Sequence, residues 1–480
     1  MLGTSSNECK RSVKLSCKIK SKCVFQSCRE LLIKDERLLF GARSSFANYP
    51  TMIVPWVLSL APALWSASPS TTCAHGPPYP KCTVQPPHQG DFTVSVVERN
   101  PIPSGAALIS HANKTSTFNF AFATAWFPPP KGPDGTAPAA EDGLVVRVVE
   151  CNDNHHACTN MTHPEWTNAG ALTVVKANLG GLQGTPTISQ PSVSDSDVFW
   201  AGVDAPPRAT TARWGAADPR IAYRALTSTY YLAWDNCTRN CFPTRTTLLS
   251  TTKDPFDKKS WIMHGALIPG EYTAGAALLF PGDAPPATDA AATASSGAAP
   301  APAPARALAF VGNSNTAAAI WLAEANDDAA LTWSIVNKTW MVGRPGCWDE
   351  CGVAPGGQVE QLSSGDYLLI YNIDTGYPYV PNPLGRCAIG WAILDRNDPK
   401  TIIARAELPL ITATQPWETC NATGKGYACQ EPHVTFTTGM KPLGGDEFLI
   451  LYGAADTDVG ATRIKVDVSR RRSNTLLQAL

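Results

Sequence analysis

The stretch Tyr230-Tyr231-Leu232-Ala233-Trp234-Asp235 decides the fold, because this aromatic strand ends in an acid and its pattern recurs. Similar strands run from Tyr367 to Asp374 and from Phe448 to Asp456. A second kind of unit, a strand followed by an acid and then a Trp, spans 246–261 and 318–333. Units that recur roughly every 60–80 residues are typical of blades around an axis, and about 380 residues supply five blades. The sequence therefore predicts an all-β, five-bladed β-propeller.

Composition agrees with this architecture. The 480 residues are 44% hydrophobic and only 16% charged, which suits a loop-rich globular protein and excludes a disordered chain or a coiled coil. A formal net charge of −1 creates no global field, so we expect no nucleic-acid partner. The eight His residues form no zinc-binding motif, and no glycine loop of the phosphate-cradling kind occurs. We therefore expect neither a metal nor a cofactor.

The chain divides into five parts by composition. Residues 1–51 are a basic N-terminal extension with ten Lys/Arg and four Asp/Glu, and 52–68 are a signal peptide or signal anchor. Residues 69–90 are a linker, a strap rich in Cys and Pro. The propeller follows at 91–468, with an Ala/Pro/Ser loop insertion at 282–305, and 469–480 form a tail.

The apolar run of about 14 residues that begins at Met52 is short for a membrane span, which needs roughly 20. Ser66-Ala67-Ser68 follow it, as at a signal-peptidase site. The sequence favours a signal peptide that starts at Met52, and hence a protein that is secreted or in the secretory lumen. The alternative is a signal anchor with the basic residues inside; the membrane is a partner only in that case.

Cysteine usage also indicates an oxidising compartment. Close pairs among the 15 Cys predict disulfides that staple loops: Cys73 with Cys82, Cys151 with Cys158, Cys237 with Cys241, Cys347 with Cys351, and Cys420 with Cys429. A four-thiolate zinc site from the third and fourth pairs is the alternative. The candidate glycosylation sites are Asn113, Asn160, Asn236, Asn337 and Asn421.

Asp218 is the principal catalytic candidate. It precedes Pro219 in the stretch from Trp214 to Ile221, upstream of the first aromatic strand, and we expect it on a rigid X-Pro turn. Arg220, two residues on, can bias the ionisation of a neighbouring acid. Local chemistry alone leaves open a structural turn acid paired with that Arg.

Motifs in order along the chain resemble those of glycoside hydrolase family 130, the five-bladed β-mannoside phosphorylases and β-mannosidases. The resemblance covers residues from about 95 to 465. Ala217-Asp218-Pro219-Arg220-Ile221 resembles the family's Glu-Asp-Pro-Arg segment, and Tyr452 to Thr457 its Tyr-Gly-Ala-Ala-Asp-Thr. The other motifs fall between these two: Arg245–Thr251, Ala276–Pro281, Gly352–Gly357 with Tyr367–Tyr371, and Ala392–Asp395 with Asp398-Pro399.

The resemblance implies roles for these residues. Asp218 takes the place of the general acid, which in the phosphorylases acts through a sugar hydroxyl. Asp456 takes the place of a ligand of the −1 sugar, and Arg220 and Arg245 border the anionic side of the pocket. The remaining candidates for substrate binding are Trp214, Tyr377, Asn372 and, as a further stacking platform, Trp348.

Departures from the family pattern favour hydrolysis. Asn372 stands where the family has a His that helps to hold phosphate, and Ala217 replaces the Glu before the catalytic Asp. Fewer cationic donors weaken phosphorolysis, because a dianion needs charge-assisted hydrogen bonds. A water nucleophile needs a carboxylate base about 6.5–9.5 Å from the acid. The first candidates are Glu418 and Glu431, followed by Glu350 and Glu360.

The sequence thus predicts a secreted glycosidase that hydrolyses β-mannosides or mannose-containing glycans with inversion, and an oligosaccharide as its partner. One alternative is a β-mannoside phosphorylase. Another is a carbohydrate-binding propeller without catalysis, since a fold alone does not guarantee its chemistry. The Asp-Pro-Arg and Tyr-Gly-Ala-Ala-Asp-Thr motifs argue against the five-bladed families that act on arabinosides or fructosides.

Overall fold

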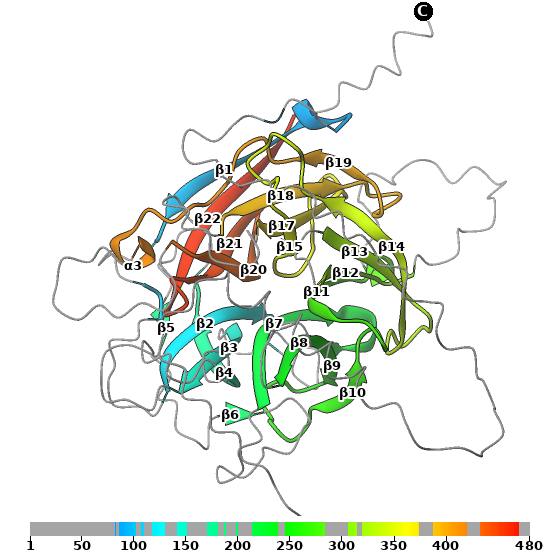
Figure 1. Cartoon of the computed structure of the whole chain (residues 1–480), viewed down its shortest axis with the longest axis vertical. Helices are drawn as coiled ribbons and strands as arrows, with labels where there is room; N and C mark the ends of the chain where they lie inside the picture. Colours follow the sequence, from blue (N-terminus) through cyan, green and yellow to red (C-terminus); the bar gives the residue numbers. More distant parts are fainter. Residues whose placement is uncertain are drawn as a thin grey trace, which may run out of the picture. The chain divides into compact units, whose positions relative to one another are not determined.

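The computed structural model is an all-β, five-bladed propeller, as the repeated strands predict (Figure 1). It describes residue 82 and residues 86–101, 107–109, 118–129, 142–150, 170–180, 187–188, 198–199, 214–238, 245–283, 306–313, 319–373, 387–419 and 433–469. These residues belong to the compact unit Ser70–Leu480. The predicted extension at 1–51, the segment 52–68 and most of the linker lie outside them, and so do residues 284–305 of the insertion and 470–480 of the tail.

Each blade is an antiparallel sheet, and the blades follow one another along the chain. Blade 1 comprises β2 (Phe118–Phe127), β3 (Asp142–Glu150), β4 (Gly170–Asn178), β5 (Thr187–Ile188) and β6 (Val198–Phe199). Blade 2 comprises β7 (Trp214–Arg224), β8 (Thr229–Thr238), β9 (Thr246–Thr252) and β10 (Ile262–Ala266). Blade 3 comprises β11 (Thr273–Leu279), β12 (Leu308–Asn313), β13 (Ala319–Ala325) and β14 (Trp333–Val342). Blade 4 comprises β15 (Val353–Pro355), β16 (Glu360–Gln361), β17 (Tyr367–Ile373), β18 (Ile389–Leu394) and β19 (Ile402–Arg405).

Blade 5 closes the ring with strands from both ends of the described chain. Its strands β20 (Thr435–Gly444), β21 (Glu447–Ala454) and β22 (Asp458–Val468) are joined by β1 (Phe92–Arg99), which pairs with β22 from Phe92 opposite Val468 onward. The described helices are single turns: η1 (Gln89–Asp91), η2 (Ala225–Thr227), η3 (Pro281–Asp283) and α3 (Pro416–Thr419). None of the described helices has the length and apolar character needed to cross a bilayer.

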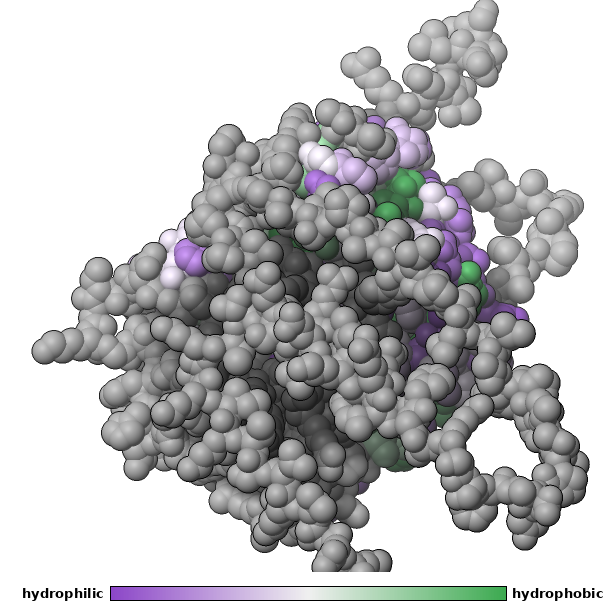
Figure 2. All heavy atoms as spheres, viewed as in Figure 1, coloured by the Kyte–Doolittle hydropathy of each residue, from purple (hydrophilic) through white to green (hydrophobic). Residues whose placement is uncertain are grey.

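The recurring aromatic strands are the second strands of their blades, β8, β17 and β21. All seven residues of β17 are buried, because a strand inside a blade is covered on both faces by neighbouring blades. Such strands read as continuous apolar runs rather than as alternating ones. On the face seen in Figure 2, the coloured surface is mainly hydrophilic, and the hydrophobic areas are small and separate.

The first strands of the blades line the axis. Each of these strands contacts the next around the ring: β2 contacts β7, β7 contacts β11, and β11 contacts β15. Strand β2 also contacts β20. Gly357, just after β15, packs on the backbone of Gly439 in β20: a Cβ at Gly357 would lie 2.9 Å from the Gly439 Cα. The close approach of these two backbones completes the inner ring.

The structure corrects two of the predicted disulfides. Cys82 pairs with Cys347, 265 residues away, so the local pairings of Cys82 with Cys73 and of Cys347 with Cys351 are wrong. This bond links the segment before β1 to the turn between β14 and β15, and it opposes a zinc site at Cys347. Cys237 lies at the end of β8. The other predicted members lie outside the described residues: Cys73, Cys151, Cys158, Cys241, Cys420 and Cys429.

Two of the predicted glycosylation sites are described. Asn337 is exposed on β14, where its Oδ1 accepts a hydrogen bond from the Thr339 amide at 2.9 Å. Asn236 is partly buried in β8 between β7 and β9. Asn113, Asn160 and Asn421 lie outside the described residues. Glycosylation of any of these residues remains a prediction.

Candidate active site

The axial strands are irregular at one level, and this irregularity builds the site. The pairing register shifts in β2 between Phe122 and Thr124, in β7 between Ala217 and Arg220, in β11 between Thr273 and Ala276, and in β20 between Thr437 and Gly439. A bulge leaves one residue out of the ladder and re-aims its side chain. The ring of bulges therefore turns backbone and side-chain groups of several blades toward the axis.

Asp218 occupies the bulge of β7. It lies within the strand rather than on a turn before it, which corrects the prediction from the sequence. Its φ of 44° is in the left-handed region, which side chains other than Gly seldom adopt. Such strained residues gather at functional sites. Pro219 fits beside Asp218 because a bulge does not require its missing N–H.

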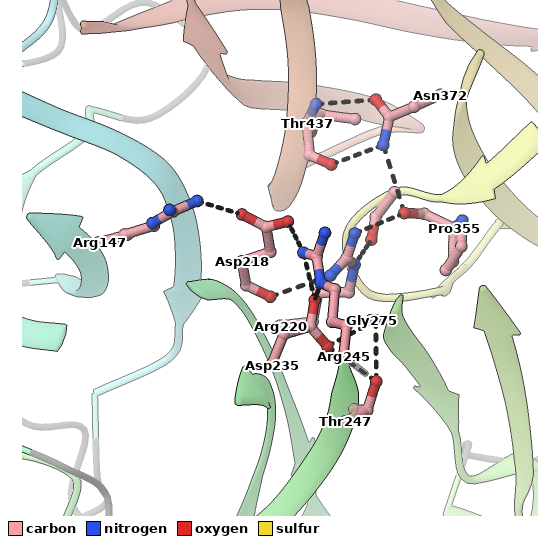
Figure 3. A network of polar contacts seen from close by, with 11 residues as sticks. Arg147, Asp218, Arg220, Asp235, Arg245, Thr247, Gly275, Pro355, Asn372 and Thr437 are labelled. Atoms are coloured by element: carbon pink, nitrogen blue, oxygen red, sulfur yellow. Dashed lines mark hydrogen bonds and ion pairs between the residues drawn. The ribbon is translucent and has the colours of Figure 1, made fainter. Parts of the chain in front are cut away.

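Two arginines from other segments bind the Asp218 carboxylate (Figure 3). Arg147, in β3 of blade 1, donates from Nη1 to Oδ1 at 3.0 Å, and Arg245, just before β9, donates from Nη2 to Oδ2. The Asp218 and Arg245 side chains are each 12% exposed, so the pair is embedded but accessible. Each of these two side chains thus keeps a small solvent-exposed fraction.

These charges decide the ionisation of Asp218. Burial alone would raise the pKa of its carboxyl, but the guanidinium groups of Arg245, Arg147 and Arg220 hold that pKa well below its usual range. The two acids Asp235 and Asp218 in turn raise the pKa of Arg245 above its ordinary value, although burial opposes this. In the ligand-free protein Asp218 is therefore a carboxylate at neutral pH, and a general acid must first gain a proton.

Arg245 is shared with a second, fully buried acid. Its Nε donates to Asp235 Oδ2 at 2.8 Å, while Asp235 Oδ1 accepts from Thr247 Oγ1 at 2.8 Å and from the Gly275 amide at 2.7 Å. The Asp235 side chain is 0% exposed. The sequence places Asp235 at the end of the first aromatic strand but gives no sign of this pairing, which joins β8, β9 and β11.

Arg220 fastens blade 2 to blade 4. Its Nε donates to Gly356 O at 2.7 Å, its Nη2 to Pro355 O at 2.9 Å, and its Nη1 to the Asp218 carbonyl at 2.9 Å. Gly275 makes room for this guanidinium, because a Cβ there would lie 2.0 Å from Nη1. With its donors turned to backbone carbonyls, Arg220 holds the bulge and contributes its charge to the site.

Arg147 is the site residue that the sequence analysis missed. It is buried in β3, in the middle of the apolar run Leu144-Val145-Val146-Arg147-Val148-Val149. A charged residue inside a buried strand needs a partner. The position of Arg147 within this apolar run could therefore have identified it as a candidate site residue. The partner, Asp218, is 71 residues away in the next blade, and sequence spacing does not reveal that distance.

Asp456 also reaches this cluster. It lies in the turn between β21 and β22, with a left-handed φ of 53°, and its charge raises the pKa of Arg147 against the larger effect of burial, which lowers it. The structure thus brings together Asp218, Arg220, Arg245 and Asp456 of the predicted residues.

Glu418, a first candidate for the base, belongs to a different cluster. Its side chain is 0% exposed, and Oε1 accepts from Arg99 Nη2 at 2.7 Å and from the Tyr452 hydroxyl at 2.6 Å. Its Oε2 accepts from the backbone amides of Thr414 at 2.6 Å and Gln415 at 2.8 Å. Four hydrogen bonds to a buried carboxylate favour a structural role, which ties α3 to β1 and β21.

The other base candidates differ in their surroundings. Glu350 accepts from the Gly346 amide at 3.0 Å in its own turn, and Glu431 lies outside the described residues. Glu360 accepts from Gln358 Nε2 at 2.7 Å, and burial raises its pKa to about 7. Among the described candidates, Glu360 has a pKa suited to a base near neutral pH.

Asn372 is buried and serves as a bracket between blades 4 and 5. Its Nδ2 donates to Pro355 O at 3.3 Å and to Thr437 O at 3.0 Å, and its Oδ1 accepts from the Thr437 amide at 2.8 Å. Both donors are used, which favours a structural role beside the site.

Trp348 is also buried, stacked on Tyr371 with ring centroids 5.8 Å apart. Trp214 begins β7, and Tyr377 lies outside the described residues.

The propeller and its axial acid–arginine cluster are those of a carbohydrate-active enzyme. The model of glycoside hydrolase family 130, described as beta-1,4-mannooligosaccharide phosphorylase, matches residues 202–470. The chain belongs to this family, which confirms the resemblance seen in the sequence.

Two curated proteins similar to this chain are phosphorylases. In Thermoanaerobacter sp. (strain X514), a 1,2-beta-oligomannan phosphorylase is 26% identical over 147 residues, 31% of this chain and 43% of that protein. A beta-1,2-mannobiose phosphorylase of the same organism is 26% identical over 118 residues, 25% of this chain and 33% of that protein. This chain thus matches less than half the length of either relative.

Solved structures share the fold. The beta-1,2-mannobiose phosphorylase from Listeria innocua, in complex with beta-1,2-mannobiose, is 18% identical with a TM-score of 0.50 and covers 78% of this chain and 96% of its own. A putative glycoside hydrolase from Bacteroides ovatus ATCC 8483 is 15% identical with a TM-score of 0.50, and the match covers 78% of this chain and 98% of that one.

Proposed function

We propose that the protein is a β-mannoside phosphorylase, which cleaves a β-mannoside with inorganic phosphate. The observation that carries this proposal is the pair of guanidinium groups, from Arg147 and Arg245, that bind the carboxylate of Asp218, with the charge of Arg220 beside them. A phosphate dianion needs charge-assisted hydrogen bonds beside the anomeric carbon, and arginine forks suit phosphate. The mannoside phosphorylases among the relatives support the same reaction.

This proposal replaces hydrolysis, the first expectation from the sequence. That expectation rested on lost cationic donors, such as the His replaced by Asn372, but Arg147 adds a buried cation from another blade. Hydrolysis also needs a second carboxylate as the base. Glu418 and Glu350 are engaged elsewhere, which weakens the support for hydrolysis from the described candidates.

The reaction needs one acid and one anion site. A phosphate oxygen forms a bond to the anomeric carbon from the face opposite the leaving group, and the glycosidic C–O bond breaks, so the configuration inverts. Protonated Asp218 gives its proton to the leaving oxygen, directly or through a sugar hydroxyl as the family resemblance implies. The products are mannose 1-phosphate and a sugar shortened by one unit, and Asp218 returns to the carboxylate form.

A product assay tests the proposal. The protein is incubated with β-1,2-mannobiose, β-1,4-mannobiose and mannosyl-N-acetylglucosamine, with and without phosphate, and mannose and mannose 1-phosphate are quantified. We expect mannose 1-phosphate that depends on phosphate. Free mannose at the same rate without phosphate would contradict the proposal and restore hydrolysis. Sugar binding without turnover of any mannoside would indicate a carbohydrate-binding propeller.

Glu360 keeps hydrolysis as the second candidate, because its pKa of about 7 suits a base. Glu360→Gln discriminates between the two reactions. A phosphorylase retains phosphate-dependent turnover in this variant, whereas a hydrolase that uses Glu360 loses its turnover. Asp218→Asn is the control for loss of turnover, which should occur in either case because both reactions need the acid.

A further inference from the structure

The two acids that share Arg245 are held in different ways. Asp235 is 0% exposed, and its oxygens accept from Arg245, Thr247 and Gly275, so its position is fixed by three segments. Asp218 is 12% exposed, and the charged partners of its carboxylate are Arg147 and Arg245. Figure 3 shows Arg245 between the two acids. Arg245 therefore has one fully buried acid as an anchor and one partly exposed acid as its other partner.

Formal charge limits what this cluster can bind. The charged groups that the described residues bring to Asp218 are Arg147 from β3, Arg220 from β7, Arg245 before β9, Asp235 from β8 and Asp456 after β21. Three guanidinium groups thus face three carboxylates. A dianion that enters this balanced cluster meets a stronger net attraction when one of the carboxylates is neutralised.

Asp218 is the carboxylate placed to be neutralised. The Nη2 of Arg245 contacts both Asp218 Oδ2 and Asp235 Oδ2. An anion that binds this Nη2 competes with Asp218, while the Nε of Arg245 keeps its hydrogen bond to Asp235. The anion also adds negative charge next to Asp218. Losing a cation and gaining an anion both favour the protonated form of a carboxyl group.

We propose that Asp235 is a positioning residue that holds Arg245 as an exchangeable partner of Asp218, so that an oxyanion bound at Arg245 brings one proton onto Asp218. Phosphate then supplies the nucleophile and also converts Asp218 from carboxylate to acid. The proton comes from solvent when the dianion binds; it passes to the leaving oxygen when the glycosidic bond breaks. This inference rests on the proposed phosphorylase function, because it takes Arg245 to be the phosphate ligand.

Proton uptake on anion binding tests the inference directly. Sulfate is the probe, because it remains a dianion from about pH 5 to 8 and cannot carry the proton itself. Its binding is followed by titration calorimetry in buffers of different ionisation enthalpy, which gives the number of protons taken up. We expect uptake approaching one proton. Where the uptake is complete, the affinity for sulfate should fall about tenfold for each unit by which the pH rises. Sulfate binding with no proton uptake across this range would overturn the inference.

Three variants locate the proton. Asp218→Asn should take up no proton and bind sulfate with an affinity that is independent of pH, at least as tightly as the parent at pH 8. Asp235→Asn leaves the cluster with excess positive charge, so the anion needs less neutralisation and the uptake should fall. Asp349→Asn is the matched control: Asp349 is a buried acid bound by Arg344 and Arg405 in blade 4, and its loss should leave the uptake unchanged. Parental uptake in Asp218→Asn or Asp235→Asn would refute the assigned roles.

The inference and the proposed function fail in different ways. If mannose 1-phosphate is never formed and neither phosphate nor sulfate binds, the phosphorylase proposal itself is wrong. If phosphorolysis proceeds and sulfate binds without a proton, the phosphorylase stands and the coupling is refuted. The dependence of kcat on pH adds a readout that a merely structural Asp235 would not move. In Asp235→Asn, the loss of kcat with rising pH should begin at a lower pH than in the parent.

Discussion

Gly275→Ala probes the clamp that Arg220 makes between blades 2 and 4. Gly275 has a φ of 75°, in the left-handed region, and a Cβ at this position would lie 2.0 Å from Arg220 Nη1 and 2.3 Å from Cζ. The backbone strain costs about 1–2 kcal/mol. Displacing a buried guanidinium is an overpacking change that costs about 1–3 kcal/mol more. We expect the free energy of unfolding to fall by about 2–5 kcal/mol.

Gly270→Ala is the matched control for this variant. Gly270 has a similar φ of 82°, but a Cβ there would meet no atom within 4 Å. This control carries the backbone strain without the collision, so its loss should be about 1–2 kcal/mol. Urea denaturation of both variants measures the difference, which is the cost of moving Arg220. Phosphorolysis should fall in Gly275→Ala and persist in Gly270→Ala, because the Arg220 Nη1 bond supports the Asp218 bulge. Equal stability and equal activity in the two variants would refute the clamp.

Three further predictions concern charge and cross-linking. Glu418→Gln should lower the free energy of unfolding by about 1–3 kcal/mol and leave kcat near the parental value, since its bonds are structural; loss of kcat in a folded protein would instead support the base role. Asp218→Asn should be less stable than the parent at neutral pH. Because the native pKa of Asp218 is depressed, the parent's advantage is present above the unfolded pKa of about 3.9 and shrinks as the pH falls below it; urea titrations at several pH values measure this. Non-reducing peptide mapping of the protein from its native source should recover a Cys82–Cys347 peptide, and reduced thiols at both positions would contradict the oxidising, secretory environment predicted from the cysteines.

Much of the fold could be predicted from the sequence because it depends on local patterns of apolar residues and on their spacing. The strands from Tyr230, Tyr367 and Phe448 became β8, β17 and β21 because a strand covered on both faces must be apolar along its length. Their spacing gives the number of blades. The bulge at Asp218 could not be predicted, because Asp-Pro is equally typical of a turn and the choice depends on the pairing of β7 with β8.

The contacts between different blades could not be predicted from the sequence. Cys82 pairs with Cys347, although nearer cysteines follow the usual rule of short spacing, because the closing strand β1 brings the N-terminal segment beside blade 4. The amide of Asn372 is used up by Pro355 and Thr437, two residues that only the ring brings together. Sequence reasoning identified the acid of the site but not its partners, because each partner comes from another element.

The choice between phosphate and water as the nucleophile depends on all the charged residues that the fold brings to the site, including those that lie outside the local sequence motif. The replacement of a His by Asn372 removes a cation from one blade, yet Arg147 of another blade binds the acid itself. A site that surrounds its acid with guanidinium groups has an inactive acid until something draws those groups away. Water carries no charge and cannot do so, whereas phosphate can. The same arginines that depress the pKa of Asp218 therefore support the phosphorolysis proposed above, because an anion that binds them relieves the depression.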